Sequence, residues 1–188
     1  LAKYTNSSDK WDWEPSAFVS SIDQPDNKTI NFELNKGIMW YDAATHDVIG
    51  ELDAEDVKYS LERMKVSEWK DKAVALDRVD VTGSHSGTIH LSQPFAPIWL
   101  TWLCDGTGAI VSKKAVEAAG GKYDGMFGFY CGPYRVKEWV QKQSYTLEAN
   151  PNWGGAPAGI KNVKFTIIDD VKTAELAFEA DEIDITHI

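Results

Sequence analysis

Alternating apolar and polar positions predict two β-hairpins in the first half of the chain. Ile30, Phe32 and Leu34 alternate with Asn31 and Glu33, which is the period-two pattern of a strand with one buried face. The hairpins are expected to pair residues 17–22 with 29–34 across a turn at 25–28, and residues 78–82 with 88–91 across 83–87. Residues 1–15, a polar stretch with two tryptophans, are expected to form a loop that leads into the first strand.

A short amphipathic helix is predicted between the hairpins. Asp53 is a suitable N-cap, and Asp56 three residues later approximates a capping box. Val57, Leu61 and Met64 then recur at i, i+4 and i+7, so that one helical face is apolar.

The second half of the chain predicts further strands and helices. An apolar helix is expected at 98–104, a strand at 109–112, a helix at 113–119 that ends at a Gly-Gly pair, and strands at 134–140 and 144–148. Residues 163–168, 172–179 and 183–185 are expected to form a right-handed β-α-β unit with parallel strands. Asp181 is expected to take a positive φ after the last helix.

Five short motifs occur in order along this pattern. They are the Phe-Glu-Leu-Asn-Lys-Gly strand end with the capped helix, Pro-Phe-Ala-Pro at 94–97, Ile-Val-Ser-Lys-Lys-Ala at 110–115, Cys-Gly-Pro-Tyr with a tryptophan at 131–139, and Asn-Pro-Asn-Trp-Gly at 150–154. From about Ser16 to Ile188 the chain resembles extracytoplasmic solute-binding proteins of family 5, the peptide, nickel and oligosaccharide receptors of ABC importers. It departs from the family pattern in the loop at 39–50, and Asp53 and Cys131 stand where threonine is usual.

The resemblance implies a mixed α/β (α+β) fold with mixed and antiparallel sheets flanked by helices, as in one lobe of a periplasmic binding protein. Residues 1–105 would form a hairpin-rich subdomain of the first lobe, and residues 106–188 part of its main sheet, leading to a hinge. The second lobe would be absent, so the chain is expected to be a fragment. Members of the family bind ligand in a cleft between two hinged lobes.

Composition limits the possible partners. The chain has 188 residues, 43% of them hydrophobic, which is enough for an ordinary core. Its formal net charge of −10 argues against nucleic acid as a partner, because no basic surface is available. No apolar run approaches the ~20 residues of a membrane span.

Four residues are ligand-binding candidates in light of the resemblance. Trp69 follows the capped helix and either faces the cleft or holds the helix to its hairpin. Trp102 is expected to serve the core or, beside the following loop, the cleft. Asp105 either meets a polar ligand group or belongs to a plain turn, and Tyr130 either contacts ligand or is structural.

The two cysteines, Cys104 and Cys131, precede segments that the family brings together, so a disulfide between them is predicted, with two buried thiols as the alternative. His46 with Asp42 and Asp47 could suggest a metal site, but a polar loop explains these residues more simply. No metal and no cofactor are expected.

The function that follows is a receptor rather than an enzyme. It would be a periplasmic or extracytoplasmic, cell-envelope-associated monomer that captures a peptide or an oligosaccharide and presents it to an ABC permease in the membrane. An alternative is a stand-alone carbohydrate-binding module that uses Trp11, Trp13 and Trp40 on one exposed face. A hydrolase would need a carboxylate pair at a defined separation, and the chain shows no catalytic motif.

Overall fold

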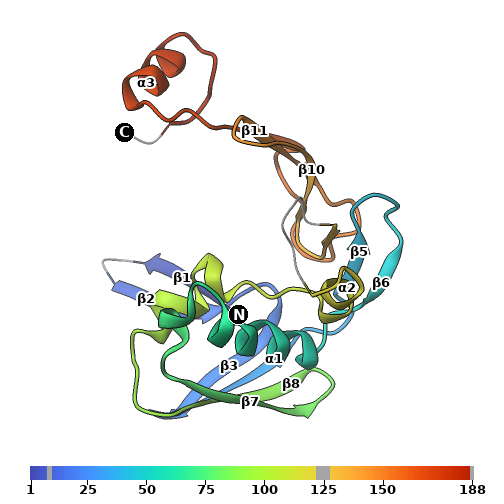
Figure 1. The fold of residues 1–188 in the computed structure, drawn as a ribbon, viewed down its shortest axis with the longest axis vertical. Helices are drawn as coiled ribbons and strands as arrows, with labels where there is room; N and C mark the ends of the chain where they lie inside the picture. The colour runs from blue at the N-terminus through green and yellow to red at the C-terminus, as the bar shows by residue number, and fades with distance from the viewer. Residues whose placement is uncertain (8–9, 122–127, 187–188) are drawn as a thin grey trace.

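The computed structural model describes residues 1–7, 10–121 and 128–186, whose strands form four small sheets with antiparallel pairing throughout (Figure 1). The largest sheet holds, in spatial order, β3 (Val19–Asp26), β4 (Thr29–Leu34), β8 (Ser86–Leu91) and β7 (Leu76–Gly83). β3 pairs with β4 and β7 with β8, so both predicted hairpins are confirmed. The fold is the mixed α/β arrangement that the sequence predicted.

The predicted capped helix is α1 (Ala54–Arg63), which lies against the large sheet (Figure 1). Asp53 accepts a hydrogen bond from the Asp56 backbone N–H, and the Asp56 side chain accepts one from the Asp53 N–H, so the capping box is complete. Val57 and Leu61 are fully buried in one core with apolar side chains of the sheet, among them Ile30, Val79 and Ile89. Burial of this apolar stripe is what fixes the helix on the sheet.

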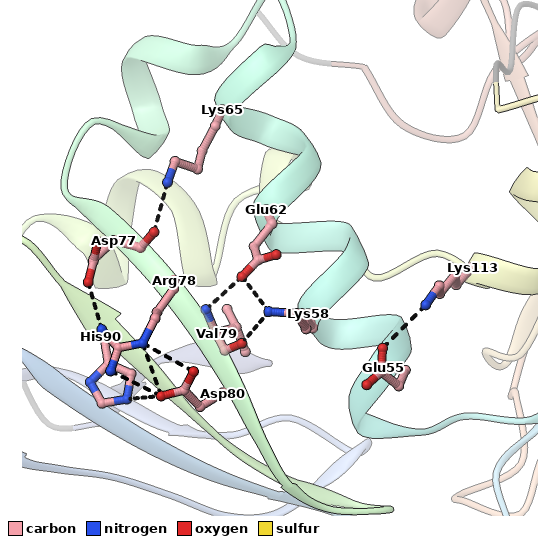
Figure 2. Close-up of polar contacts among 10 residues, drawn as sticks. All are labelled: Glu55, Lys58, Glu62, Lys65, Asp77, Arg78, Val79, Asp80, His90 and Lys113. Carbon is pink, nitrogen blue, oxygen red and sulfur yellow. Dashed lines mark hydrogen bonds and ion pairs between the residues drawn. The ribbon is translucent and has the colours of Figure 1, made fainter.

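Charged side chains along the edge of α1 add polar links to β7 (Figure 2). Lys58 Nζ donates to Glu62 Oε1 at 2.7 Å and to the Val79 carbonyl at 2.6 Å, and Glu62 Oε1 accepts from the Val79 N–H at 2.9 Å. Lys65 Nζ donates to the carbonyl of Asp77 at 2.7 Å. The helix is therefore held to the strand along its length as well as through the core.

Residues 1–7 and 10–15 differ from the prediction of a loop. They form an antiparallel hairpin of β1 (Ala2–Ser7) and β2 (Lys10–Pro15), whose register runs from the pair Ala2 and Pro15 to the pair Ser7 and Lys10. Lys3 Nζ forms an ion pair with Glu14 Oε1 across the hairpin, at 2.9 Å. The mostly polar composition led to the prediction of a loop, because strand pairing depends on partner segments that local composition does not reveal.

A third sheet consists of β6 (Val48–Glu51), β5 (Met39–Asp42) and β9 (Phe129–Tyr130) in that order. Short helical turns occupy the connections: η1 (Met64–Val66), η2 (Lys70–Ala73), the π-helix η3 (Trp99–Leu103) and η4 (Gly106–Gly108). The helix predicted at 98–104 is thus confirmed as η3.

The strand predicted at 109–112 is wrong, whereas the helix after it is confirmed as α2 (Lys113–Ala118). The Val111 N–H donates to Ser60 Oγ on α1 at 2.9 Å. This backbone N–H therefore has a side-chain acceptor in place of the carbonyl of a neighbouring strand. Ser112 caps α2, and Gly120 and Gly121 both take φ of +80° after it, as expected of a helix end.

The last sheet places β11 (Ser144–Ala149) between β10 (Tyr134–Val140) and β12 (Asn162–Thr166), with α3 (Val171–Glu179) beyond it (Figure 1). The predicted β-α-β unit is wrong, because β12 pairs antiparallel with β11 and the described residues after α3 form no strand. Asp181 does take the expected positive φ, at +57°. None of the residues of α3 is buried.

Candidate functional site

Two pockets adjoin beside β9, and Cys131 is a lining residue of both. The first has a volume of about 410 Å³ and the second about 330 Å³. Concave surfaces of this size are the usual setting of a small-molecule site. The motif segments at the strand end after β4 and at 131–139 and 150–154 supply part of their walls.

The first pocket has a mixed lining in which polar and aromatic residues stand beside apolar residues and glycines. Asn35, Lys36, Tyr41, Asn152 and Trp153 are among the residues that form it. These side chains offer amide donors and acceptors, one ammonium group and two ring faces. Such a lining suits hydrogen bonds to a polar ligand backbone together with ring stacking.

The second pocket is apolar, with one carboxylate. Phe18, Leu34, Leu103 and Ile110 are among its apolar lining residues. Asp105 is the ionised side chain among the described residues that line it. An apolar pocket with a carboxylate at its wall suits a ligand that carries a positive charge next to an apolar group.

Aromatic packing joins the two pockets, and one buried asparagine holds the neighbouring turn. Phe18 from the second pocket and Trp153 from the first pack with ring centroids 5.3 Å apart. Asn150 is buried, and its Nδ2 donates to the Gly132 carbonyl at 2.9 Å while its Oδ1 accepts from the Asn152 N–H at 2.9 Å. The asparagine thus fixes the turn that presents Trp153.

Two of the predicted site residues, Asp105 and Trp69, are linked through Lys72. Lys72 Nζ forms an ion pair with Asp105 Oδ2 at 2.6 Å and lies 5.4 Å from the centre of the Trp69 ring. Asp105 Oδ1 accepts a hydrogen bond from the Thr107 N–H, which holds the carboxylate in place. The hydrogen bond from Lys72 keeps the pKa of Asp105 below its ordinary value, so the group is an anion. Trp69 is 58% exposed.

Trp102 has a core position rather than a ligand-facing one, which corrects its place among the predicted contacts. It is 1% exposed and belongs to the core cluster with Leu103 and Ile98. The apolar pattern of η3 turns this side chain inward, because burial of its ring removes a large apolar surface from water. Its carbonyl oxygen lies next to Gly108, so Trp102 supports the second pocket from behind.

Tyr130 is buried, and it supports the first pocket through a neighbour. Its ring stacks on Tyr41 with centroids 5.4 Å apart, and its hydroxyl forms a 2.9 Å hydrogen bond with His46 Nδ1. Burial raises the pKa of Tyr130 above its ordinary value, so it stays a neutral phenol. Of these two rings, it is Tyr41 that lines the pocket.

Both cysteines are free thiols, which corrects the predicted disulfide. Cys104 and Cys131 do line the same pocket, as the resemblance implied when it brought their segments together. A shared pocket does not bring two sulfur atoms within the ~2 Å of a covalent bond. Burial raises the pKa of Cys131 to about 12 and also raises that of Cys104, so both thiols are protonated at neutral pH.

Sequence reasoning missed the residues that join the two pockets. The sequence pattern predicts only a strand position for Phe18, and the motif at 150–154 indicates the family rather than site residues. The signal for a site is the tryptophan of this motif, which follows an asparagine able to hold a turn.

Two other arrangements considered from the sequence do not form in the described part of the chain. Trp40 is 4% exposed, so it does not join a flat exposed tryptophan face, and the carbohydrate-binding module is not supported. No group of three or more His, Cys, Asp and Glu side chains within the described ranges is arranged to hold a metal ion. Nor does any described helix combine the length and apolarity required to span a bilayer.

Comparison with known proteins gives a consistent match. Residues 13–188 match the family model described as bacterial extracellular solute-binding proteins, family 5 Middle. The chain is 32% identical over 140 residues to the probable D,D-dipeptide-binding periplasmic protein DdpA of Escherichia coli, covering 70% of this chain and 27% of DdpA. It is 30% identical over 111 residues to the periplasmic oligopeptide-binding protein OppA of Salmonella typhimurium, covering 58% of this chain and 20% of OppA.

Solved structures share the fold. The ABC transporter-associated periplasmic binding protein DppA of Helicobacter pylori, in complex with the peptide STSA, superposes with a TM-score of 0.76 at 21% sequence identity. The match covers 97% of this chain and 39% of the DppA chain. The chain thus spans about a quarter of the length of the curated relatives and about two fifths of this structural neighbour.

Proposed function

Because the chain belongs to the bacterial extracellular solute-binding proteins of family 5, we propose that it contributes a ligand-binding lobe to an extracytoplasmic receptor for short peptides. The receptor would capture a peptide and deliver it to an ABC permease in the membrane. The observation that carries this proposal is the family match over residues 13–188, whose motif segments line the two pockets that meet at Cys131.

A peptide suits the two pockets better than an oligosaccharide does. The first pocket offers amide groups and rings for a peptide backbone, through Asn35, Asn152 and Trp153. The second offers an apolar surface for a side chain and the carboxylate of Asp105 for a positive group. The relatives named above are described as binding dipeptides and oligopeptides, which supports the same ligand class.

The proposed mechanism is capture by closure of two lobes. Residues 1–105 would form the hairpin-rich subdomain of the first lobe and residues 106–188 would belong to its main sheet, with further contacts to ligand coming from a second lobe. A ligand that touches both lobes binds the closed state better and shifts the population toward it. Within this lobe Asp105 and Trp69 are the proposed ligand contacts, Tyr130 acts through Tyr41, and Trp102 supports the pocket wall.

The proposed receptor has no catalytic step. It would act in the periplasm or at the outer face of the cell envelope, a location that the names of the periplasmic relatives support. We also propose that it acts as a monomer.

The test is a ligand screen on the full-length protein by thermal shift and isothermal titration calorimetry, with dipeptides, tripeptides, oligopeptides and a matched set of oligosaccharides. A peptide present at a hundredfold excess over its dissociation constant should stabilise the protein by about 2.7 kcal/mol by mass action. Binding of oligosaccharides alone, or turnover of a peptide during the titration, would refute the proposal.

A further inference from the structure

His85 lies in the turn between β7 and β8 and joins this turn to the end of β6. Its Nε2 lies 3.0 Å from Glu51 Oε1, and its Nδ1 lies 2.9 Å from the hydroxyl oxygen of Ser84. The His85 side chain is 14% exposed and that of Glu51 is 38% exposed. Because an ionised carboxylate only accepts hydrogen bonds, Nε2 carries the hydrogen and donates it to Glu51.

The same oxygen of Glu51 holds a turn that lines the first pocket. The Gly37 N–H donates to Glu51 Oε1 at 2.6 Å, and Gly37, Ile38 and Met39 are lining residues of the pocket. Gly37 takes a φ of +78°, and a Cβ there would meet nothing within 4 Å. A glycine in open space has many conformations available. The hydrogen bond to Glu51 therefore contributes to selecting the observed one.

Protonation of His85 strengthens this link without breaking it. Nδ1 faces the hydroxyl of Ser84, which donates to the neutral ring and accepts from the imidazolium. The bond to Glu51 then joins opposite charges, and charge-assisted hydrogen bonds are the stronger kind. The hydrogen bond from the Gly37 N–H, and then that from His85, keep the pKa of Glu51 below its ordinary value. Glu51 is therefore still an anion at pH 5.

Two other charged side chains belong to the segments around this pair. Lys36 lies in the turn that Glu51 holds, and its charge acts on the carboxylate. Asp53 lies beside the turn of His85, because the N–H of the residue after it donates to the Ser84 carbonyl at 2.8 Å. Lysine and aspartate side chains ordinarily keep one charge state from pH 5 to 8, whereas histidine changes its charge in this range. His85 is therefore the group whose titration acts on Glu51 there.

We propose that His85 and Glu51 form a proton-sensitive latch on the turn at 35–38, which holds this wall of the first pocket more firmly as the pH falls from 8 to 5. In the latched state the imidazole has an anionic partner, and in the open state it does not. The latched state therefore binds the proton more tightly, and protonation shifts the population toward it. His85 acts through Glu51, so it is a positioning residue. The inference goes beyond the proposed function and does not depend on the ligand.

The experiment measures water exchange of the Gly37 amide by NMR at pH 5, 6.5 and 8, on the ¹⁵N-labelled full-length protein without ligand. After correction for the intrinsic exchange rate, the protection factor of this amide should be up to about fivefold higher at pH 5 than at pH 8, the size of one partly exposed ion pair. His85→Gln should remove this pH dependence, because glutamine still donates to Glu51 but does not titrate. Glu51→Gln should remove it as well, because the charged partner is gone.

A second histidine on the same hairpin provides the matched control (Figure 2). His90 Nε2 lies 3.0 Å from Asp80 Oδ2, and neither of these two described residues lines the first pocket. His90→Gln should therefore keep the pH dependence of the Gly37 amide. The Gly108 amide donates to the Asp105 carbonyl at 3.0 Å and serves as an internal reference, whose protection should stay constant in every sample.

Three results would overturn the inference. Equal protection of the Gly37 amide at pH 5 and pH 8 would show that no latch operates. A pH dependence that survives in His85→Gln or Glu51→Gln would assign it to another group. Loss of the dependence in His90→Gln, or a parallel change at Gly108, would show a general response of the fold. None of these results concerns peptide binding, so the ligand screen tests the proposed function separately.

Discussion

Trp40 Nε1 donates a 2.7 Å hydrogen bond to Asp56 Oδ2, and both residues are buried. The same carboxylate accepts a 2.7 Å hydrogen bond from the Lys113 N–H through Oδ1 and a 3.4 Å bond from the Asp53 N–H through Oδ2. One side chain therefore joins β5, the start of α1 and the start of α2. It therefore links segments that are 16 and 57 positions from Asp56 in the sequence.

Removal of this carboxylate should destabilise the protein strongly. Asp56→Ala leaves the Trp40 and Lys113 donors buried without an acceptor and breaks the capping box, for a combined loss of about 3 kcal/mol. Trp40→Phe alone should cost about 1 kcal/mol, and the double variant should lose less than the sum of the two. Urea unfolding followed by circular dichroism measures all three. Asp77→Ala, at an exposed position on β7, is the control, and a similar loss there would contradict the assignment.

The titration of Asp56 gives a pH dependence of a defined sign. Burial raises the pKa of Asp56 above its ordinary value, against the lowering effect of the hydrogen bonds from Lys113 and Trp40. The folded state therefore holds the proton more tightly than the unfolded state does. The stability from this group is fully present below its unfolded pKa of about 3.9 and is lost as the pH rises through the higher folded pKa.

The measurement is the difference in unfolding free energy between the native protein and Asp56→Asn, taken at several pH values from 3.5 upward. The variant does not titrate at this position, so subtraction removes the contribution of the other carboxylates. The advantage of the native protein should decrease as the pH rises and then level off. An advantage that grows with pH would mean that the folded state lowers this pKa.

Gly108 should not tolerate a side chain. A Cβ at this position would lie 2.1 Å from the Trp102 carbonyl oxygen, which is backbone and cannot move aside. Gly108→Ala should therefore cost about 2–3 kcal/mol and reshape the second pocket. Gly106→Ala is the matched control two residues away, because a Cβ there meets nothing within 4 Å. Equal melting temperatures for the two variants would contradict the close approach.

Both cysteines should be present as thiols, and both should react slowly with a thiol reagent in the folded protein. A shift of the pKa of Cys131 from 9.0 to about 12 lowers its thiolate fraction at pH 8 roughly a thousandfold, and the thiolate is the reactive form. Ellman's reagent should find two thiols in denaturant without reductant and a much slower reaction in the folded protein. Cys131→Ser should remove the slowest phase, whereas Cys104→Ser should keep it. Fewer than one thiol per chain in denaturant would restore the disulfide.

Sequence patterns predicted the strands and the helix whose signals lie in neighbouring residues. The period-two run at Ile30, Phe32 and Leu34 and the cap at Asp53 were read correctly, because alternation and capping depend on neighbours in the sequence. The β1–β2 hairpin and the antiparallel partner of β12 were missed, because pairing depends on segments that local periodicity does not reveal.

The candidate site was only partly predictable for a similar reason. The family resemblance places the loop of Asp105 at the cleft, but Lys72, 33 positions earlier, pairs with Asp105 only through the folding of η2 against η3. Trp102 and Tyr130 have the residue types of ligand contacts, yet burial assigns them to packing. Residue type alone does not tell which face of an aromatic ring is covered.

The place of Cys131 in the wall of both pockets also bears on how such a receptor could diversify. A bulkier side chain at this one position would reduce the volume of both pockets at once. A single substitution would thus alter two adjoining cavities while the surrounding scaffold stays the same.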